Sequence, residues 1–252
     1  MKSKVFFIEE ISAENLVKIY YALNKELPGK VAIKVHSGEA GNQNYLRPEF
    51  LQQIVNEVKG TIVECNTTEK HLQLREDHGW SKYFNVDILD GEGPDMELDI
   101  PWGKVIQKDY VGKRLKNYDS CLVLSRFKGH PMGGYGGALK QLSIGFASSY
   151  GKAYIHGAGK PEEKWTVDHD KFLESMADAA SIVPSFFNGN ICYINIMCNM
   201  SVDCDCCAVA EDPCMKDIGI LASTDPIALD QACIDLVYQS KDPGRDHLVE
   251  RI

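Results

Sequence analysis

Apolar positions along the chain follow two periods, one typical of buried strands and the other of amphipathic helices. Short apolar runs predict strands, and stretches with apolar residues three or four positions apart predict a helix after most of them. This alternation predicts a single α/β domain over residues 1–252, with a mainly parallel sheet and helices on both faces. The predicted strands are 4–8, 30–35, 61–65, 121–125, 191–197 and 217–222, and the predicted helices are 12–23, 48–60, 69–78, 138–146, 168–183 and 225–238.

The middle of the chain departs from this alternation. Residues 96–100 and 104–107 alternate in polarity around a Pro-Trp-Gly turn, which predicts a small antiparallel hairpin inserted at about 94–110. Residues 151–166 are rich in Gly, Lys and His without a clear period, so no element is predicted there.

Several helix ends carry clear signals. Ser12 and Asp225 are typical N-cap residues, and Pro48 suits the first turn of a helix that Gly60 would stop. Asp225 is therefore assigned a structural role, and Asp230 is interpreted as an ordinary carboxylate on a helix face.

Polar clusters follow four of the predicted strands. In parallel sheets of this kind, ligands bind beyond the carboxyl ends of the strands. The clusters therefore predict one composite site. They lie at 36–39, 66–68, 126–140 and 198–214.

The segment from Ser125 to Lys140 joins a strand to a helix and is rich in glycine. Its open backbone would let a ligand approach closely, and the free N–H groups of the following helix favour an anion. The segment matches neither a Walker loop nor a dinucleotide fingerprint, and a plain tight turn is the alternative. Lys128 and Lys140 would neutralise a phosphate or carboxylate, and His130 would be an acid, base or metal ligand. The glycines expected to border the ligand are Gly129, Gly133, Gly134, Gly136 and Gly137.

Lys34 and His36 share one face of an extended chain and complete the predicted site. A lysine between two apolar residues is unusual in a buried strand, so we assign Lys34, His36 and His130 as candidate catalytic residues. A solvated strand end with a salt bridge is the alternative. Glu39 and Asn66 are candidate ligand-binding residues, although asparagine is also a common turn residue.

The nine cysteines are unevenly distributed. We predict that Cys204 and Cys206 bind a metal, completed by Cys198, Cys214 or a histidine, because thiolates bind zinc and iron–sulfur clusters in sets of about four. Adjacent Cys206 and Cys207 are expected to point apart. Redox-active thiols or inert loop cysteines are the alternatives. Four others are predicted to be buried and inert: Cys65, Cys121, Cys192 and Cys233.

Charge and length narrow the classes of partner. The formal net charge is −9, which argues against a general binder of nucleic acid or of anionic membranes. No apolar run approaches the roughly 20 residues that span a bilayer, and the N-terminus turns acidic too early for a signal peptide. We therefore expect a cytoplasmic protein with reduced thiols and a small anionic ligand, without nucleic-acid or membrane partners.

The four clusters, taken in order, resemble the DUF362 family, whose uncharacterised members are often described as iron–sulfur centre proteins. The resemblance covers nearly the whole chain. The matching segments are Val31 to Glu39, Cys121 to Lys140, Asp203 to Cys206, and Asp217 to Ala232.

The chain departs from the family pattern at one place. Many relatives carry a ferredoxin-like insertion with two Cys-x-x-Cys-x-x-Cys runs, but the corresponding region here, 151–168, contains no cysteine. The two clusters of that insertion are therefore not expected, and a separate ferredoxin becomes a candidate partner.

Three functional hypotheses follow. The first is an enzyme or redox protein that depends on an iron–sulfur cluster or zinc and acts on a small anionic ligand. The second is a metal-free acid/base enzyme acting on a phosphate or carboxylate compound. The third is a non-catalytic module that binds a ligand or a ferredoxin.

Overall fold

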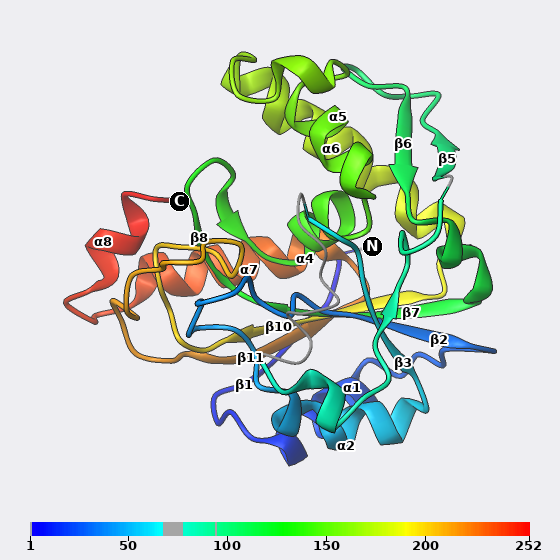
Figure 1. Ribbon diagram of the computed structural model, residues 1–252. Helices are drawn as coiled ribbons and strands as arrows, with labels where there is room; N and C mark the ends of the chain where they lie inside the picture. The colour runs from blue at the N-terminus through cyan, green and yellow to red at the C-terminus, as the bar shows by residue number, and fades with distance from the viewer. Residues whose placement is uncertain (1, 68–77, 94) are drawn as a thin grey trace.

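A computed structural model describes residues 2–67, 78–93 and 95–252 of the chain. Its centre is a seven-stranded sheet with the strand order β1-β11-β10-β7-β2-β3-β4 (Figure 1). The α/β architecture predicted from the sequence is therefore confirmed. The strands are β1 (Val5–Ile8), β2 (Val31–Lys34), β3 (Thr61–Glu64), β4 (Asp87–Ile88), β7 (Ser120–Arg126), β10 (Ile191–Met197) and β11 (Gly219–Ser223).

The sheet is mainly parallel. β10, β7, β2, β3 and β4 pair in parallel, and β11 and β1 add an antiparallel edge. The carboxyl ends of β2, β3, β7 and β10 consequently meet at one edge of the sheet, where the sequence placed the polar clusters.

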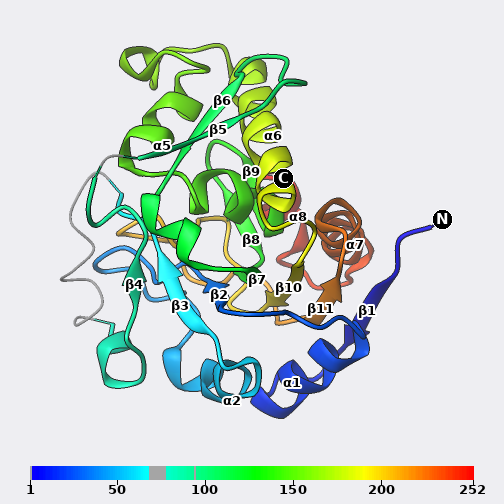
Figure 2. The same ribbon diagram turned by 90° about the vertical axis from the view of Figure 1, so that its right-hand side faces the viewer.

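Helices cover both faces of this sheet (Figures 1 and 2). Strand β7 shows why: Cys121 and Val123 belong to one apolar core, whereas Leu122 and Leu124 belong to the other. Successive side chains of a strand point to opposite faces, so a strand without polar alternation requires cover on both sides. One face is covered by α1 (Ala13–Ala22) and α2 (Pro48–Val58), and the other by α4 (Ala138–Lys140), α5 (Ser149–His156), α6 (His169–Phe186) and α7 (Pro226–Gln239).

The predicted helix ends are mostly confirmed. The Ser12 hydroxyl accepts a hydrogen bond from the backbone N–H of Asn15 at 3.2 Å, and Asp225 caps α7. One prediction was wrong in detail, because α2 ends at Val58 and the residue after it, Lys59, takes the left-handed conformation that was expected of Gly60, with φ 50°. None of the described helices is both long enough and apolar enough to cross a bilayer.

The inserted hairpin exists, but its second strand lies later than predicted. Strand β5 (Met96–Asp99) pairs with β6 (Lys108–Val111), not with residues 104–107. The Asp178 carboxylate on α6 accepts hydrogen bonds from the backbone N–H groups of residues 104–106, at 2.7–3.1 Å. These N–H groups are therefore unavailable for strand pairing.

Residues 151–166 also differ from the prediction, because α5 continues to His156 and the turn Pro161–Glu163 follows it. The helix was not predicted because Gly151 lies within it and glycine disfavours helices. A Cβ at this position would lie 2.0 Å from the Tyr110 carbonyl oxygen, so the close packing requires glycine. The predicted helix over 69–78 lies outside the described residues except for His78. Shorter elements are Trp80–Lys82, Lys113–Asn117, β8 (Lys128–His130), β9 (Gly134–Gly136), Gln141–Gly145 and α8 (Arg245–Val249).

Candidate functional site

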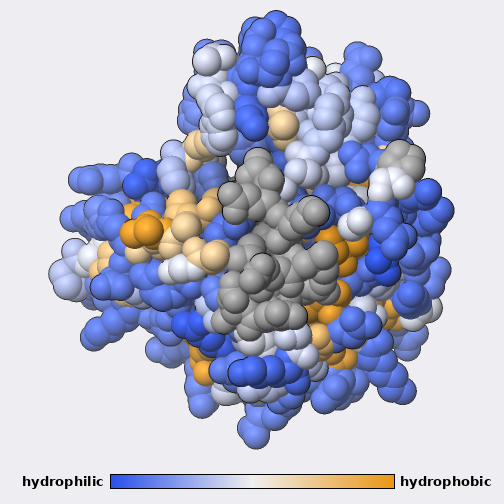
Figure 3. Space-filling model, viewed as in Figure 1, coloured by the Kyte–Doolittle hydropathy of each residue, from blue (hydrophilic) through white to orange (hydrophobic). Residues whose placement is uncertain are grey.

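A cavity of about 830 Å³ opens at the carboxyl ends of the parallel strands. Its wall includes residues that end β2 and β3, the segment after β7, the cysteine-containing loop after β10, and parts of α4 and α5. In the view of Figure 3 the surface is mainly hydrophilic, and hydrophobic residues gather along the middle, at the height of the sheet. The cavity lies where the sequence analysis predicted a composite site.

Lys34 lies in the cavity wall, but Glu64 already neutralises it. The Lys34 side chain is 1% exposed, and its Nζ lies 2.7 Å from Glu64 Oε2. Glu64 Oε1 also accepts the backbone N–H of Ser37 at 2.7 Å. The sequence analysis missed Glu64, although its position at the end of a strand beside a buried lysine was the signal.

Lys128 is neutralised in the same way. Its Nζ lies 2.9 Å from Asp205 Oδ2 and donates to the Arg126 carbonyl oxygen at 2.8 Å. Arg126, which is 1% exposed, holds the other Asp205 oxygen at 2.7 Å. The positive charges of Lys128 and Lys34 are therefore both balanced by carboxylates of the protein itself.

Lys140 differs, because its nearest partners are thiols. Its Nζ lies 3.2 Å from Cys204 Sγ and 3.8 Å from Cys206 Sγ. Burial disfavours the charge, but the two thiols hold the pKa of Lys140 above its ordinary value. A cationic group this close favours the thiolate forms of both cysteines.

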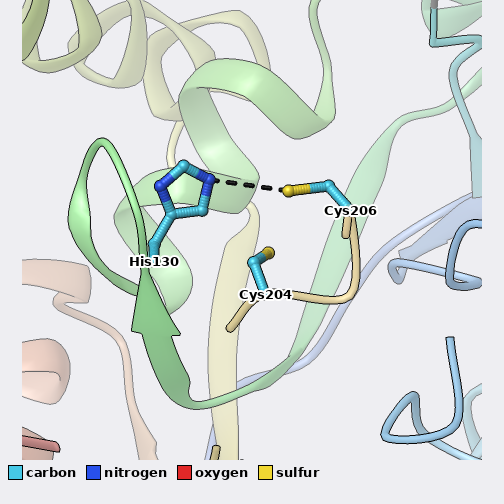
Figure 4. A group of neighbouring side chains, drawn as sticks. All are labelled: His130, Cys204 and Cys206. Carbon is cyan, nitrogen blue, oxygen red and sulfur yellow. Dashed lines mark hydrogen bonds between the residues drawn. The ribbon is translucent and has the colours of Figure 1, made fainter. Parts of the chain in front are cut away.

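His130 faces the same thiols with its Nε2 atom, 3.6 Å from Cys206 Sγ (Figure 4). Its Nδ1 accepts the backbone N–H groups of Met132 at 3.2 Å and Gly133 at 2.8 Å. A neutral imidazole with Nδ1 as acceptor carries its proton on Nε2, so His130 donates toward Cys206. Burial, with Lys140 and Lys128 nearby, lowers the pKa of His130 and keeps the ring neutral.

His36 is arranged similarly. Its Nδ1 accepts the backbone N–H of Gly38 at 3.0 Å, which leaves the proton on Nε2. Burial lowers the pKa of His36 to about 4, against an opposing effect of Glu64. At neutral pH His36 and His130 are therefore both uncharged N–H donors.

Cys204, Cys206 and His130 form the one group of potential metal ligands found in the described part of the chain, with donor atoms within 4.8 Å of one another (Figure 4). The predicted pair of cysteines is thus brought together. Cys198 and Cys214, which the sequence offered as further ligands, lie outside this group.

Other cysteines behave mostly as predicted. Cys206 and Cys207 were expected to point apart, but their thiols hydrogen-bond each other, because the backbone turns tightly from Cys204 to Cys207. The cysteines predicted to be buried are so, and burial raises their pKa values: Cys65, Cys121, Cys192 and Cys233.

The glycine-rich segment folds differently from the prediction. Strands β8 and β9 form a short hairpin in it, and the first N–H groups of α4 are not free for an anion. Those of Ala138 and Leu139 donate to the buried carboxylate of Asp230 at 2.8 and 2.9 Å. Asp230 is therefore no ordinary face residue, and a Cβ on Gly137 would lie 2.4 Å from its Oδ1.

The remaining predicted ligand-binding residues divide into two sets. Asn66 donates to Asp90 from its backbone N–H and side-chain amide, and Gly129 packs tightly against the backbone of Val202. Neither contributes to the cavity lining, and Gly133, Gly134 and Cys204 do not either. The predicted residues that do line the cavity are Lys34, His36, Glu39, Lys128, His130, Gly136, Gly137, Lys140 and Cys206.

Helix α5 brings a lysine that the sequence analysis missed. Lys152 lines the cavity, and its Nζ donates to the carbonyl oxygens of Asn66 at 2.7 Å and Ala147 at 2.6 Å. Trp165, which follows α5, lies at the cavity and is 72% exposed. Because no helix was predicted here, no sequence signal connected these residues to the site.

Comparison with family models matches residues 31–235 to a domain of unknown function, DUF362. This chain belongs to the DUF362 family. The resemblance noted in the sequence is thus confirmed, and the matched range contains every element that contributes to the cavity. A search of curated proteins found no match.

Two solved structures share the fold of this DUF362 protein. The lactate racemase apoprotein from Thermoanaerobacterium thermosaccharolyticum is 16% identical with a TM-score of 0.53, covering 94% of this chain and 58% of its own. A protein from Thermotoga maritima is 12% identical with a TM-score of 0.53, covering 92% of this chain and 60% of its own. The DUF362 chain thus spans about three fifths of either structure, and the likeness concerns the fold.

Proposed function

We propose that this DUF362 protein is an enzyme or redox protein that binds an anionic molecule in the cavity, beside a soft metal held by Cys204 and Cys206. The observation that carries the proposal is the convergence of the Cys204 and Cys206 thiols beside the cavity, where both sulfurs lie within 4.8 Å of each other and of a His130 ring nitrogen. A metal bound there by few protein ligands would keep a coordination position open, as catalytic sites do.

The donor set fits a soft or borderline metal such as zinc. Burial raises the pKa of Cys204 to about 12, so metal binding would release thiol protons. Lys140, the present cationic neighbour of both sulfurs, would lose part of that role to the metal. His130 directs Nε2–H toward Cys206, and this tautomer makes it a donor to the thiolate rather than a third ligand.

An iron–sulfur cluster fits less well. Such clusters usually take four cysteine thiolates. All nine cysteines lie in the described part of the chain, and the group at the cavity contains two of them. We therefore favour a single metal ion over a cluster.

The chain's own residues would position and polarise the ligand. His36 and His130 offer neutral N–H groups, which can stabilise negative charge developing on a bound molecule. Lys140 adds a buried positive charge next to the Cys204 and Cys206 thiols. The metal, when bound, would supply Lewis-acid or thiolate-ligated redox chemistry.

The test is metal analysis of protein purified without oxygen. We expect close to one equivalent of zinc or another transition metal in the wild-type protein, and a thiolate-to-metal absorption band after cobalt substitution. Cys204→Ser and Cys206→Ser should each lose most of the metal.

Cys198→Ser is the matched control, because Cys198 is also half-buried but lies outside the ligand group. It should retain the metal. Wild-type protein that holds no stoichiometric metal, or equal losses in Cys198→Ser and Cys206→Ser, would contradict the proposal.

A second candidate is a metal-free acid/base enzyme acting on a carboxylate. It is favoured by the two uncharged histidines, both with Nδ1 fixed as an acceptor, and the fold shared with a lactate racemase apoprotein is compatible with it. Ligand turnover that survives in Cys204→Ser and Cys206→Ser but not in His130→Gln would favour this candidate.

A further inference from the structure

The cavity is larger than a small anion needs. Its volume of about 830 Å³ is near the upper end of the range for pockets that enclose drug-sized ligands. Cys206, His130 and Lys140 occupy one part of the wall, while α5 and the residues after it form another. The α5 part has its own polar group and its own apolar surface.

Lys152 is the cationic group that α5 itself contributes to this second part, and Lys164 after α5 also lines the cavity, with its Nζ 5.6 Å from the centre of the Trp165 ring. The Lys152 ammonium group has three N–H donors, and two of them donate to the carbonyl oxygens of Asn66 and Ala147. A third N–H has no acceptor among the described residues. Burial lowers the pKa of Lys152, against opposing effects of Cys65 and Asp90.

Charge pairing separates Lys152 from two other cavity lysines. Lys34 and Lys128 have carboxylate partners at 2.7 and 2.9 Å. Among the described residues no carboxylate lies within 4.0 Å of the Lys152 ammonium, which instead contacts neutral carbonyls. The Lys152 side chain is half-buried, and an ammonium that is partly removed from water without a counter-ion is destabilised, so an anionic group of a ligand would be stabilising there.

The apolar surface lies next to this lysine. Tyr150 and Trp165 line the cavity although they are 49% and 72% exposed, and Met132 and Ile144 line it as well. Large aromatic side chains at a cavity mouth are typical of surfaces that cover an apolar part of a ligand.

We infer that the ligand of this cavity is a carboxylate with an apolar or aromatic body, whose carboxylate binds Lys152 and whose body contacts Tyr150 and Trp165. The inference rests on the proposed ligand cavity and specifies its substrate class. A carboxylate suits this part of the site better than a phosphate, because Lys152 offers one free N–H and no arginine is found in the described lining.

The test compares three probes: 3-phenylpropanoate, 3-phenylpropan-1-ol and acetate. Binding to the metal-containing protein is measured by calorimetry and by the indole N–H signal of Trp165, assigned with Trp165→Phe. We expect 3-phenylpropanoate to bind at least about tenfold more tightly than either other probe and to shift this signal, since it alone has both groups.

Lys152→Gln should weaken 3-phenylpropanoate binding roughly ten- to a hundredfold and leave binding of the alcohol unchanged. Lys160→Gln is the matched control, because Lys160 is an exposed lysine paired with Glu163, and it should change neither affinity. Should Lys152→Gln fail to fold, Trp165→Ala serves instead, because this exposed residue should affect phenylpropanoate binding and not acetate binding.

Equal affinities for the acid and the alcohol, an unchanged affinity in Lys152→Gln, or tighter binding of inorganic phosphate than of 3-phenylpropanoate would each overturn the inference. Metal content, measured on the same samples, separates this outcome from failure of the proposed function. If the metal content depends on Cys206 but binding of 3-phenylpropanoate does not depend on Lys152, only the inference is overturned. If this binding depends on Lys152 but the protein holds no metal, only the metal proposal is overturned.

Discussion

At the scale of single residues, Asp205 is a buried acid beside the site that pairs with two cations. It is 1% exposed and holds two buried cations, Arg126 at 2.7 Å and Lys128 at 2.9 Å. Burial alone would raise the pKa of Asp205, but Arg126 and Lys128 hold it well below the ordinary value. Its contribution to stability is therefore present at neutral pH and lost as the pH falls below about 4.

Asp205→Asn should lower the free energy of unfolding by about 3–5 kcal/mol at pH 7, because it leaves Arg126 and Lys128 without a buried counter-ion. Urea denaturation measures the change. Asp203→Asn in the same loop is the control and should cost less than about 1 kcal/mol, since Asp203 pairs with Arg251 only at 3.9 Å and asparagine can still accept the hydrogen bond from the Glu211 backbone N–H. Equal losses of unfolding free energy in the two variants would show that the ion pairs of Asp205 do not account for its contribution to stability.

At the scale of elements, the inserted hairpin β5–β6 carries a buried acid. Asp109 on β6 is fully buried, and this burial raises its pKa to about 7, against a weaker lowering effect of the Tyr110 backbone N–H. In the unfolded chain the same group releases its proton near pH 4. The hairpin is therefore most stable when Asp109 is protonated, and this contribution is lost as the pH rises from about 4 to 7.

Asp109→Asn should remove this dependence. We expect the variant to be more stable than wild type at pH 8, by as much as about 4 kcal/mol, and to differ little at pH 4. Thermal unfolding across this range measures the difference. Asp99→Asn on the exposed side of the partner strand should leave the pH profile unchanged, and an unchanged profile in Asp109→Asn would refute the explanation.

At the scale of the whole molecule, one cavity joins segments from most of the chain. Its lining extends from Lys34 on β2 to Ala208 in the loop after β10, and α5 closes the opposite wall. A ligand or metal bound there contacts elements far apart in sequence. Binding to the folded state alone should therefore stabilise the complete fold.

Zinc added to the metal-free protein at about 100 times its dissociation constant should raise the free energy of unfolding by up to about 2.7 kcal/mol. Calorimetric melting measures the shift. Cys206→Ser should abolish it, whereas Cys214→Ser should retain it because Cys214 lies outside the ligand group. A similar zinc effect in both variants would place the metal elsewhere.

Much of the fold could be predicted from the sequence. Strands such as 121–125 and 191–197 are continuous apolar runs, and caps such as Ser12 and Asp225 act within one helical turn. These features depend on local chemistry and on the period of the pattern. The predicted link between strand ends and one site needed only the rule that parallel strands end at the same edge.

Other features depended on partners distant in the sequence. The Asp178 carboxylate binds the backbone N–H groups of residues 104–106, so the second hairpin strand forms later, at β6. Helix α5 contains Gly151 because it packs tightly against β6, and a glycine gives no helix signal in the sequence.

The sequence by itself determined the α/β class, the two apolar cores and the gathering of lysines, histidines and cysteines at one sheet edge. The tertiary structure decided how those charges pair. Lys34 and Lys128 pair with the carboxylates of Glu64 and Asp205. The ammonium group of Lys140 instead contacts thiols, and that of Lys152 contacts backbone carbonyls. The reason is that local patterns fix which face a side chain occupies, while an ion pair depends on distances between elements that only packing sets.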